Sequence, residues 1–313
     1  GRSKNKAELC RHTNLKISFK RMFERGQTIP VLKENYPNLS QISIKNKIQT
    51  YWKKRKILMS HPIYTIGLFI LKIVDLFGFT FGYIFPRQVY FLKSVAKSYE
   101  SKRMSTNFTL YKHFVECYSL KDMILKRGKI IEIGSGTGRI TKEFVDKGFN
   151  IISTDPSSTM LKEFSKKKNL PKPVLAFGDK LPFKAKSFNS SFAIRVIWHH
   201  PRSKSLAIIK EMVRVSSSFV IFDVVNNKRL FKFFITPNTY PVNLKTFIKI
   251  CKKECGIKIE KIIPMDVTLP IWLNLFPKKF AKNIYSPLYK LDLKLARIMP
   301  PGRYLLKFKI VKN

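Results

Sequence analysis

Hydrophobic and polar positions divide the chain into three zones. Residues 1 to about 56 are polar and basic, and residues 57–86 are the most hydrophobic part of the sequence. From about residue 104 onward, short apolar runs alternate with longer amphipathic stretches. This alternation is typical of an α/β protein in which buried strands form a parallel sheet and helices connect them. We therefore predict a basic helical region over residues 1–100 and an α/β domain over residues 101–313.

The hydrophobic zone includes a stretch long enough to cross a bilayer. Residues 63–85 number 23, and about 20 apolar residues span the hydrocarbon core. However, Lys72 and Asp75 lie in the middle of this stretch, and one charge at the bilayer centre costs about 2.5–3.5 kcal/mol. Their spacing permits an ion pair on one helix face. We expect residues 57–86 to form interfacial or re-entrant helices that associate peripherally with a membrane. A single transmembrane segment over residues 63–85 and a hairpin packed on its own domain remain alternatives.

The charge balance narrows the kinds of partner that this fold is expected to bind. Lysine and arginine number 61 against 19 aspartates and glutamates, so the formal net charge is +42, while 44% of the residues are hydrophobic. That hydrophobic content is too high for a disordered basic tail. A folded chain so basic is expected to bind an anionic partner, which includes nucleic acid, a phosphate-bearing substrate and an anionic membrane surface.

The cysteines indicate neither a disulfide framework nor a metal site. Among the four, only Cys251 and Cys255 are close, and no further cysteine or histidine lies nearby at the spacing that a zinc site requires. We expect two reduced thiols on an amphipathic helix and no bound metal. Because reduced cysteines favour the cytoplasm, and because the sequence shows no signal peptide, we expect a cytoplasmic protein.

The strongest chemical signal is a glycine turn between a buried strand at residues 130–133 and a helix at residues 141–146. The turn contains three alternate glycines, Gly134, Gly136 and Gly138. Glycine permits a positive φ and a close approach of the backbone to a ligand beside a helix N-terminus. A dinucleotide-binding turn would have its third glycine one residue later, where this chain has Arg139. Glu132, inside the strand, would repel a pyrophosphate but could accept a hydrogen bond from an ammonium group. The turn therefore favours a cationic, nucleoside-like ligand.

Further strands follow in an order that suits such a ligand. The second predicted strand, residues 150–155, ends in Asp155, 19 residues after the central glycine. A carboxylate at this position suits the two hydroxyls of a ribose. The third predicted strand closes at residues 177–179, which places Asp179 and Leu181 where an adenine would lie. The fourth predicted strand covers residues 187–196.

Taken in order, these elements make residues 105–225 resemble the class I S-adenosylmethionine-dependent methyltransferases, and within them the group related to ubiquinone and menaquinone biosynthesis methyltransferases. The resemblance implies a Rossmann-like sheet of seven mostly parallel strands with helices on both faces. A fifth strand at residues 219–225 and a last strand at residues 304–311 are consistent with that fold. Three serines at residues 216–218 replace the glycine pair that normally precedes strand five, so we expect this turn to differ.

The same resemblance implies which residues bind the cofactor, S-adenosyl-L-methionine. In the family, an E-x-G-x-G-x-G loop holds the methionine part; here Glu132 and the three glycines form that loop. Asp155 would bind the ribose, and Asp179 with Leu181 would lie beside the adenine. The chain departs from the family at Asn189, where the family has an acidic residue with a mostly structural role.

Two adjacent histidines are the candidate catalytic residues. His199 and His200 follow the fourth predicted strand, on the cofactor side of the sheet. A hydroxyl or amine acceptor needs a base to take its proton, and histidine suits that role near neutral pH. The alternative is that one histidine caps or packs against the strand end and the other is solvated.

The C-terminal region, residues 226–303, is predicted to form a substrate cap. It combines apolar anchors, Trp272, Phe276, Tyr285 and Tyr289, with lysines and arginines. Such a cap suits an amphiphilic acceptor with an acidic head, such as a lipid-linked phosphate or a quinone precursor. The alternative is an insertion that merely completes the core.

The N-terminal region carries a second resemblance. Residues 1–86 resemble the C-terminal tail of family 2 nucleotide-sugar glycosyltransferases, which end in basic helices at the membrane. The chain opens with Gly1 instead of methionine, so we expect a fragment or a fusion. Three hypotheses remain: a methyltransferase acting on a small-molecule, lipid or glycan acceptor near a membrane, a nucleic-acid methyltransferase, and a non-catalytic, membrane-bound remnant of a glycosyltransferase. A fragment of a bifunctional glycosyltransferase–methyltransferase is a further alternative.

Overall fold

The computed structural model describes residues 22–23, 27, 62–84, 89–229 and 239–311. The chain divides into two compact units, residues 1–93 and 94–313.

In the first unit the main described element is helix α5 (Pro62–Ile84). Its Lys72 ammonium lies 3.3 Å from the Asp75 carboxylate, as their spacing predicts. Within the described ranges, no helix combines the length and the apolar character needed to cross a membrane, and this includes α5, for which the sequence left a span open. The glycosyltransferase-like resemblance falls mostly outside the described residues.

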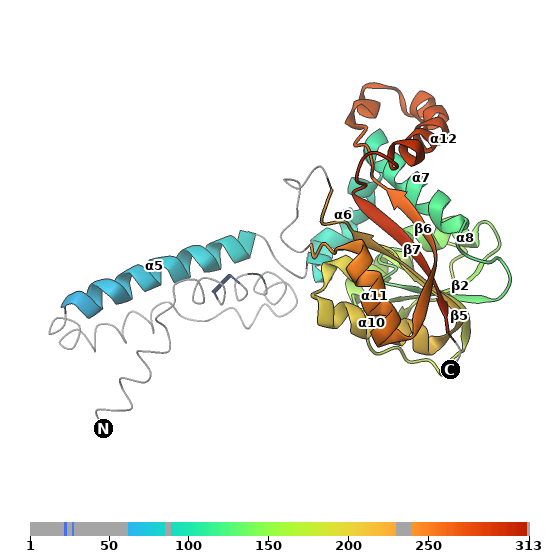
Figure 1. Cartoon of the computed structure of the whole chain (residues 1–313). Helices are drawn as coiled ribbons and strands as arrows, with labels where there is room; N and C mark the ends of the chain where they lie inside the picture. The colour runs from blue at the N-terminus through green and yellow to red at the C-terminus, as the bar shows by residue number, and fades with distance from the viewer. Residues whose placement is uncertain (1–21, 24–26, 28–61, 85–88, 230–238, 312–313) are drawn as a thin grey trace. The chain divides into compact units, whose positions relative to one another are not determined.

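The second unit is built on one seven-stranded sheet with the strand order β3-β2-β1-β4-β5-β7-β6 (Figure 1). Strands β1 to β5 pair in parallel, and β7 runs antiparallel to both β5 and β6. The bounds are β1 (Lys129–Ile133), β2 (Asn150–Asp155), β3 (Val174–Leu175), β4 (Phe188–Ala193), β5 (Ser216–Val225), β6 (Ile257–Met265) and β7 (Arg303–Ile310). The predicted Rossmann-like, mostly parallel sheet is therefore confirmed.

Several strands differ in extent from the prediction. The third strand ends at Leu175, before the predicted closure at residues 177–179. The fifth begins at Ser216, so the serines lie inside the strand. The Oγ of Ser216 donates to the Oγ of Ser191 on β4, which satisfies a hydroxyl that would otherwise be buried without a partner.

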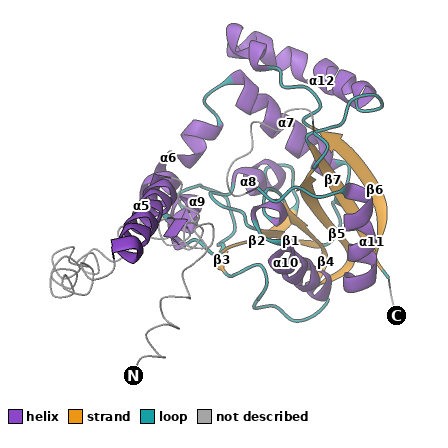
Figure 2. Cartoon of the chain, turned by 60° about the vertical axis from the view of Figure 1, so that its left-hand side comes forward, coloured by secondary structure: helices purple, strands orange, loops and turns teal. Residues whose placement is uncertain are grey.

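Helices cover both faces of the sheet (Figure 2). On one face, α7, α8 and α12 pack in a core cluster that includes Ile130 of β1. On the other face, α10 and α11 pack in a cluster that includes Ile131. Successive strand residues point to opposite faces, and because helices cover both faces, the strand residues on both must be apolar.

The helices are α6 (Lys93–Arg103), α7 (Asn107–Lys121), α8 (Arg139–Val145), α9 (Ser158–Phe164), α10 (Arg202–Val215), α11 (Leu244–Cys255) and α12 (Lys278–Leu295), with 3-10 turns η2 (Val89–Phe91), η3 (Ile197–His199) and η5 (Ile271–Leu275).

Much of the predicted cap belongs to the core instead. Helix α11 buries Phe247 and Cys251 against the sheet, and β6 is one of its edge strands. Tyr285 and Tyr289 on α12 are also buried, because they face α7: the Tyr289 hydroxyl lies 2.8 Å from the Ser119 hydroxyl. The expectation that these two tyrosines contact an acceptor as part of an open cap is therefore wrong. Trp272 and Phe276 stay exposed.

Candidate cofactor and acceptor site

The glycine turn after β1 has the backbone that its sequence predicts. Gly134, Gly136 and Gly138 have φ values of 73°, 57° and 75°. A Cβ on Gly134 would lie 2.4 Å from Cγ2 of Val196, and one on Gly138 would lie 2.5 Å from the ring of Phe164. A Cβ on Gly136 would meet nothing within 4 Å. The outer glycines thus permit close packing, whereas the central one leaves open space beside its backbone.

Asp155 lies against this turn, at the end of β2. Its Oδ2 accepts a hydrogen bond from the Gly136 N–H at 2.8 Å, and its Oδ1 accepts one from the Ser157 N–H at 2.8 Å. Burial raises the pKa of the carboxyl to about 6, although these two backbone donors favour its charged form. Each oxygen retains a further lone pair for a ligand hydroxyl.

Glu132 is buried beneath the turn instead of lining its surface. Its Oε2 accepts a hydrogen bond from the Thr141 hydroxyl at 2.5 Å, and that hydroxyl also lies 2.8 Å from the Ser153 hydroxyl. Burial raises the pKa of Glu132 to about 7. In this arrangement Glu132 ties the first turn of α8 to β1 and β2, so its contacts are with the protein.

Two hydroxyls of the turn fit a polar ligand. The Oγ of Ser135 and the Oγ1 of Thr137 are buried, and neither has a hydrogen-bond partner among the described residues. Because buried polar groups are nearly always paired, these hydroxyls mark a place where a ligand supplies the missing partners. Together with the open space at Gly136 and the Asp155 carboxylate, they suit a nucleoside that carries hydroxyl and ammonium donors.

The predicted adenine residues are held by the protein. Asp179 forms an ion pair with Lys204, and this hydrogen bond lowers the pKa of its carboxyl. Leu181 is buried in the core, and its N–H donates to Glu211 at 3.0 Å. Thus the Leu181 side chain does not offer a surface to an adenine. The exposed apolar side chains at this edge are instead Leu175 and Phe177.

The two histidines have different surroundings. Strand β4 ends at Ala193, earlier than predicted, and the turn η3 follows it. The His199 ring stacks on Trp198 with 4.0 Å between ring centroids. His200 lines a cavity of about 350 Å³, which Trp198 and Tyr240 also line. The geometry therefore favours His200 over His199 as a group that meets an acceptor.

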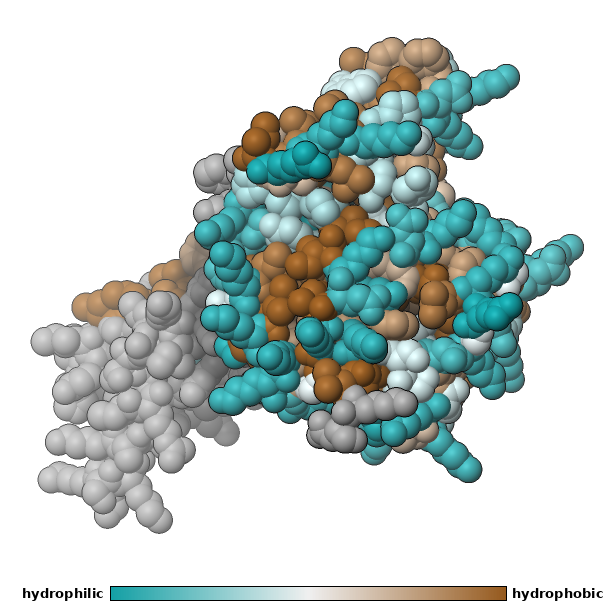
Figure 3. Space-filling model, turned by 45° about the vertical axis from the view of Figure 1, so that its right-hand side comes forward, coloured by the Kyte–Doolittle hydropathy of each residue, from teal (hydrophilic) through white to brown (hydrophobic). Residues whose placement is uncertain are grey.

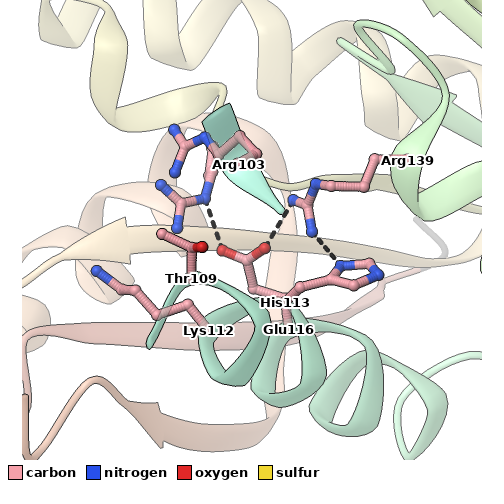
Figure 4. A pocket seen from close by; sticks show the side chains of 7 residues that line it. Arg103, Thr109, Lys112, His113, Glu116 and Arg139 are labelled. Atoms are coloured by element: carbon pink, nitrogen blue, oxygen red, sulfur yellow. Dashed lines mark hydrogen bonds and ion pairs between the residues drawn. The ribbon is translucent and has the colours of Figure 1, made fainter. Parts of the chain in front are cut away.

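A buried charge cluster beside the turn was missed by the sequence analysis. Glu116 of α7 accepts hydrogen bonds from Arg139 at 2.7 Å, Arg195 at 2.6 Å and Arg303 at 3.0 Å. Burial alone would raise the pKa of Glu116, but the three guanidinium groups hold it well below its ordinary range. Arg139 also donates to the His113 ring, and burial with this neighbouring charge lowers the pKa of His113 to about 4 (Figure 4).

The partners of Glu116 come from distant parts of the sequence. Arg139 begins α8, Arg195 follows β4 and Arg303 begins β7. Arg303 also donates to Asp223 at 2.8 Å and to Asp266 at 2.6 Å. The one signal in the sequence was Arg139, which stands where a dinucleotide fold has glycine.

Comparison with known proteins shows the enzyme class of this domain. Residues 131–221 match a family described as "Methyltransferase domain". The chain contains a methyltransferase domain. The predicted enzyme class, an S-adenosylmethionine-dependent methyltransferase, and its cofactor are thereby confirmed. No curated protein matches the chain significantly.

Solved structures share the fold of this domain at low sequence identity. An S-adenosylmethionine-dependent methyltransferase of Thermotoga maritima, described as a possible histamine N-methyltransferase, is 15% identical with a TM-score of 0.50; the match covers 72% of this chain and 100% of that one. A chain of the complex between the Trm112 methyltransferase activator of Haloferax volcanii and a methyltransferase is 10% identical with a TM-score of 0.51, covering 71% of this chain and 98% of that one.

Proposed function

We propose that this methyltransferase, a relative of the ubiquinone and menaquinone group, acts on a small-molecule, lipid or glycan acceptor at the surface of an anionic membrane. The observation that supports the membrane part is an exposed aromatic row that runs from η5 to the first turn of α12. Trp272, Phe276 and Phe280 form this row, with ring centroids 5.9 Å and 5.3 Å apart. All three are exposed, and Leu275 beside them is 84% exposed. Contiguous exposed apolar surface is typical of interaction sites.

Cations accompany the aromatic row. Lys278, Lys279 and Lys282 are exposed, and none forms an ion pair with a described carboxylate. Residues 269–299 carry six lysines and arginines and one acidic residue, Asp292, which is buried. Figure 3 has apolar and hydrophilic side chains next to each other at the top of the molecule, where α12 lies. Each cation near an anionic leaflet contributes about 1 kcal/mol, so the basic edge favours anionic lipid headgroups over a neutral protein surface.

The cofactor supplies a methyl group on a sulfonium sulfur when it is bound, and the chain's own residues bind and align the reactants. Asp155 would accept hydrogen bonds from two ribose hydroxyls, and Ser135 and Thr137 would pair with polar groups beside the turn. His200, at the cavity, would take the proton from an acceptor hydroxyl or amine. Holding the two reactants in line accounts for much of the acceleration in such a transfer.

A second candidate acceptor is RNA, which the net charge of +42 favours. A third proposal follows from the N-terminal resemblance: the chain is a piece of a bifunctional glycosyltransferase–methyltransferase, which would favour a glycan or glycolipid acceptor.

The test is transfer of a labelled methyl group from S-adenosylmethionine to a lipid extract or to total RNA. We expect label in the lipid fraction. Label confined to RNA would replace the first proposal by the second.

Vesicle flotation tests the proposal that the protein binds an anionic membrane through the aromatic row. Flotation with vesicles that contain phosphatidylglycerol should carry the protein upward, and neutral phosphatidylcholine vesicles should not. The Trp272→Ala/Phe280→Ala variant should lose flotation. The matched control, Leu125→Ala/Ile262→Ala, removes two exposed apolar side chains elsewhere and should keep it. Equal flotation of both variants would refute the assignment of the aromatic row.

A further inference from the structure

A small hollow beside the glycine turn is lined mainly by cations. Arg103 comes from α6, Lys112 from α7, Arg139 from the start of α8 and Arg195 from the loop after β4. Figure 4 shows Arg103, Lys112 and Arg139 around the carboxylate of Glu116. These side chains are brought together from four separate elements, and between them is left a hollow of about 10 Å³, which has room for one small group such as a single oxygen of an anion.

The cluster around this hollow holds more cations than carboxylates. Its three carboxylates, those of the buried Glu116 and Asp223 and of the partly buried Asp266, are matched by three guanidinium groups, those of Arg139, Arg195 and Arg303. The surplus consists of Lys112 and Arg103.

Lys112 is weakly compensated. Its ammonium is 3.9 Å from Asp266, whose carboxylate is already bound by Arg303 at 2.6 Å. Asp266 raises the pKa of Lys112, but burial together with Arg195 and Arg303 lowers it below the ordinary value on balance. Its surroundings therefore disfavour the positive charge, and an added anion would relieve this.

Arg103 forms no ion pair with any carboxylate in the described part of the chain; its guanidinium lies 5.5 Å from the centre of the Tyr99 ring. Two further glutamates, on α6 and α8, pair with other cations: Glu100 with Lys167 and Glu143 with Lys147. Because partly buried cations are costly without a counter-ion, the hollow suits an oxyanion.

The hollow adjoins the cofactor turn. Arg139 directly follows Gly138, and Arg195 precedes Val196, whose side chain fills the space that a Cβ on Gly134 would need. Arg195 has a φ of 62°, and its N–H donates to Asp223 at 2.6 Å. A non-glycine residue in the left-handed region is uncommon and is held there by its surroundings. Because Arg139 and Arg195 both line the hollow and both lie beside the glycine turn, a group bound in the hollow would belong to a molecule next to the cofactor.

We propose that Arg103 and Lys112 bind a carboxylate or phosphate group of the methyl acceptor, so that the acceptor is an anion. This proposal rests on the proposed function, because it assumes that the acceptor lies beside the glycine turn. The surplus charge then has two roles: it selects acceptors with an oxyanion, and it fixes their orientation relative to the methyl donor. The competing ligand is the carboxylate of the cofactor itself.

The first arm of the test measures binding of inorganic phosphate by calorimetry to protein saturated with S-adenosylhomocysteine. Wild type should bind phosphate, and Arg103→Gln/Lys112→Gln should bind it at least tenfold more weakly, since two charge-assisted hydrogen bonds are lost. The matched control is Lys97→Gln/Lys121→Gln, two exposed lysines on the same two helices, which should bind as wild type does. Phosphate binding that is absent from wild type, or equal in both double variants, would overturn the proposal.

The second arm separates the two sources of an oxyanion. The affinities of S-adenosylhomocysteine, which carries a carboxylate, and of methylthioadenosine, which does not, should both be unchanged by Arg103→Gln/Lys112→Gln. A selective loss for S-adenosylhomocysteine would assign the hollow to the cofactor and overturn the proposal. Failure of wild type to bind S-adenosylhomocysteine would instead contradict the proposed function. Unfolding midpoints measured alongside, with the single variant Arg103→Gln as a milder change, distinguish a lost anion site from a lost fold.

Discussion

Replacing Glu116 by glutamine should destabilise the α/β unit more than any surface change. The Glu116 side chain is 1% exposed and binds three guanidinium groups. Glutamine keeps the shape but loses the charge, and its amide N–H groups would face arginine N–H groups. Breaking a buried ion pair by removing one partner costs about 3–5 kcal/mol. Domains are stable by only about 5–15 kcal/mol, so the loss is a large fraction of the total.

Urea denaturation followed by circular dichroism measures the change in unfolding free energy, and thermal denaturation followed in the same way measures the change in unfolding midpoint. At about 2–4 °C per kcal/mol for a unit of this size, the unfolding midpoint should fall by roughly 6–20 °C. The matched control is Glu143→Gln, which removes a half-exposed partner of Lys147 four residues away and should change the unfolding free energy by less than about 0.5 kcal/mol. A loss below about 1 kcal/mol for Glu116→Gln would refute the reasoning.

The same variant has a predicted pH dependence. The pKa of Glu116 is depressed in the folded protein, so its stabilising contribution is complete above the unfolded pKa of about 4.5 and is lost as the pH falls through the folded value. The difference in unfolding free energy between wild type and Glu116→Gln should therefore be constant above about pH 5 and shrink in more acidic solution.

Three further predictions concern the turn and its neighbours. Gly138→Ala should cost about 2–4 kcal/mol of unfolding free energy, because its φ is 75° and the new Cβ would meet a phenyl ring at 2.5 Å. The control is Gly256→Ala, where φ is 64° but the space is open, and it should cost about 1–2 kcal/mol. Equal losses in the two variants would contradict this packing argument. Asp155→Ala should weaken S-adenosylhomocysteine binding, measured by calorimetry, by about tenfold or more. The affinity of wild type should decrease as the pH is lowered past about 6, because the buried carboxylate then takes up a proton. An affinity that stays constant down to about pH 5 would argue against a role of the charged form. Replacing both His199 and His200 by alanine should leave cofactor affinity intact and slow methyl transfer by about 10²–10⁴-fold; unchanged turnover would exclude both from catalysis.

Local sequence determined the strand and the glycine turn of the candidate cofactor site, and it predicted the helix after them, which begins at Arg139 instead of residue 141. The three isoleucines within residues 130–133, followed at once by a glycine turn, predicted a short buried strand, and the glycines at 134, 136 and 138 supply positive φ values that other residues rarely adopt. The strand at residues 150–155 was predicted with its observed bounds, and so was the position of Asp155 at its end. These features depend on neighbours in the chain, which is why composition and spacing were sufficient to find them.

Only the tertiary structure decided which polar groups meet. The three arginines bound by Glu116 are 23, 79 and 187 residues away along the chain, so no spacing rule could have paired them. Burial of individual side chains could not be predicted from the sequence either. Tyr285 and Tyr289 were predicted to be exposed anchors, but they are buried because α12 packs on α7. Charge pairing and burial depend on how distant elements pack around a shared core, and that is set by the whole fold.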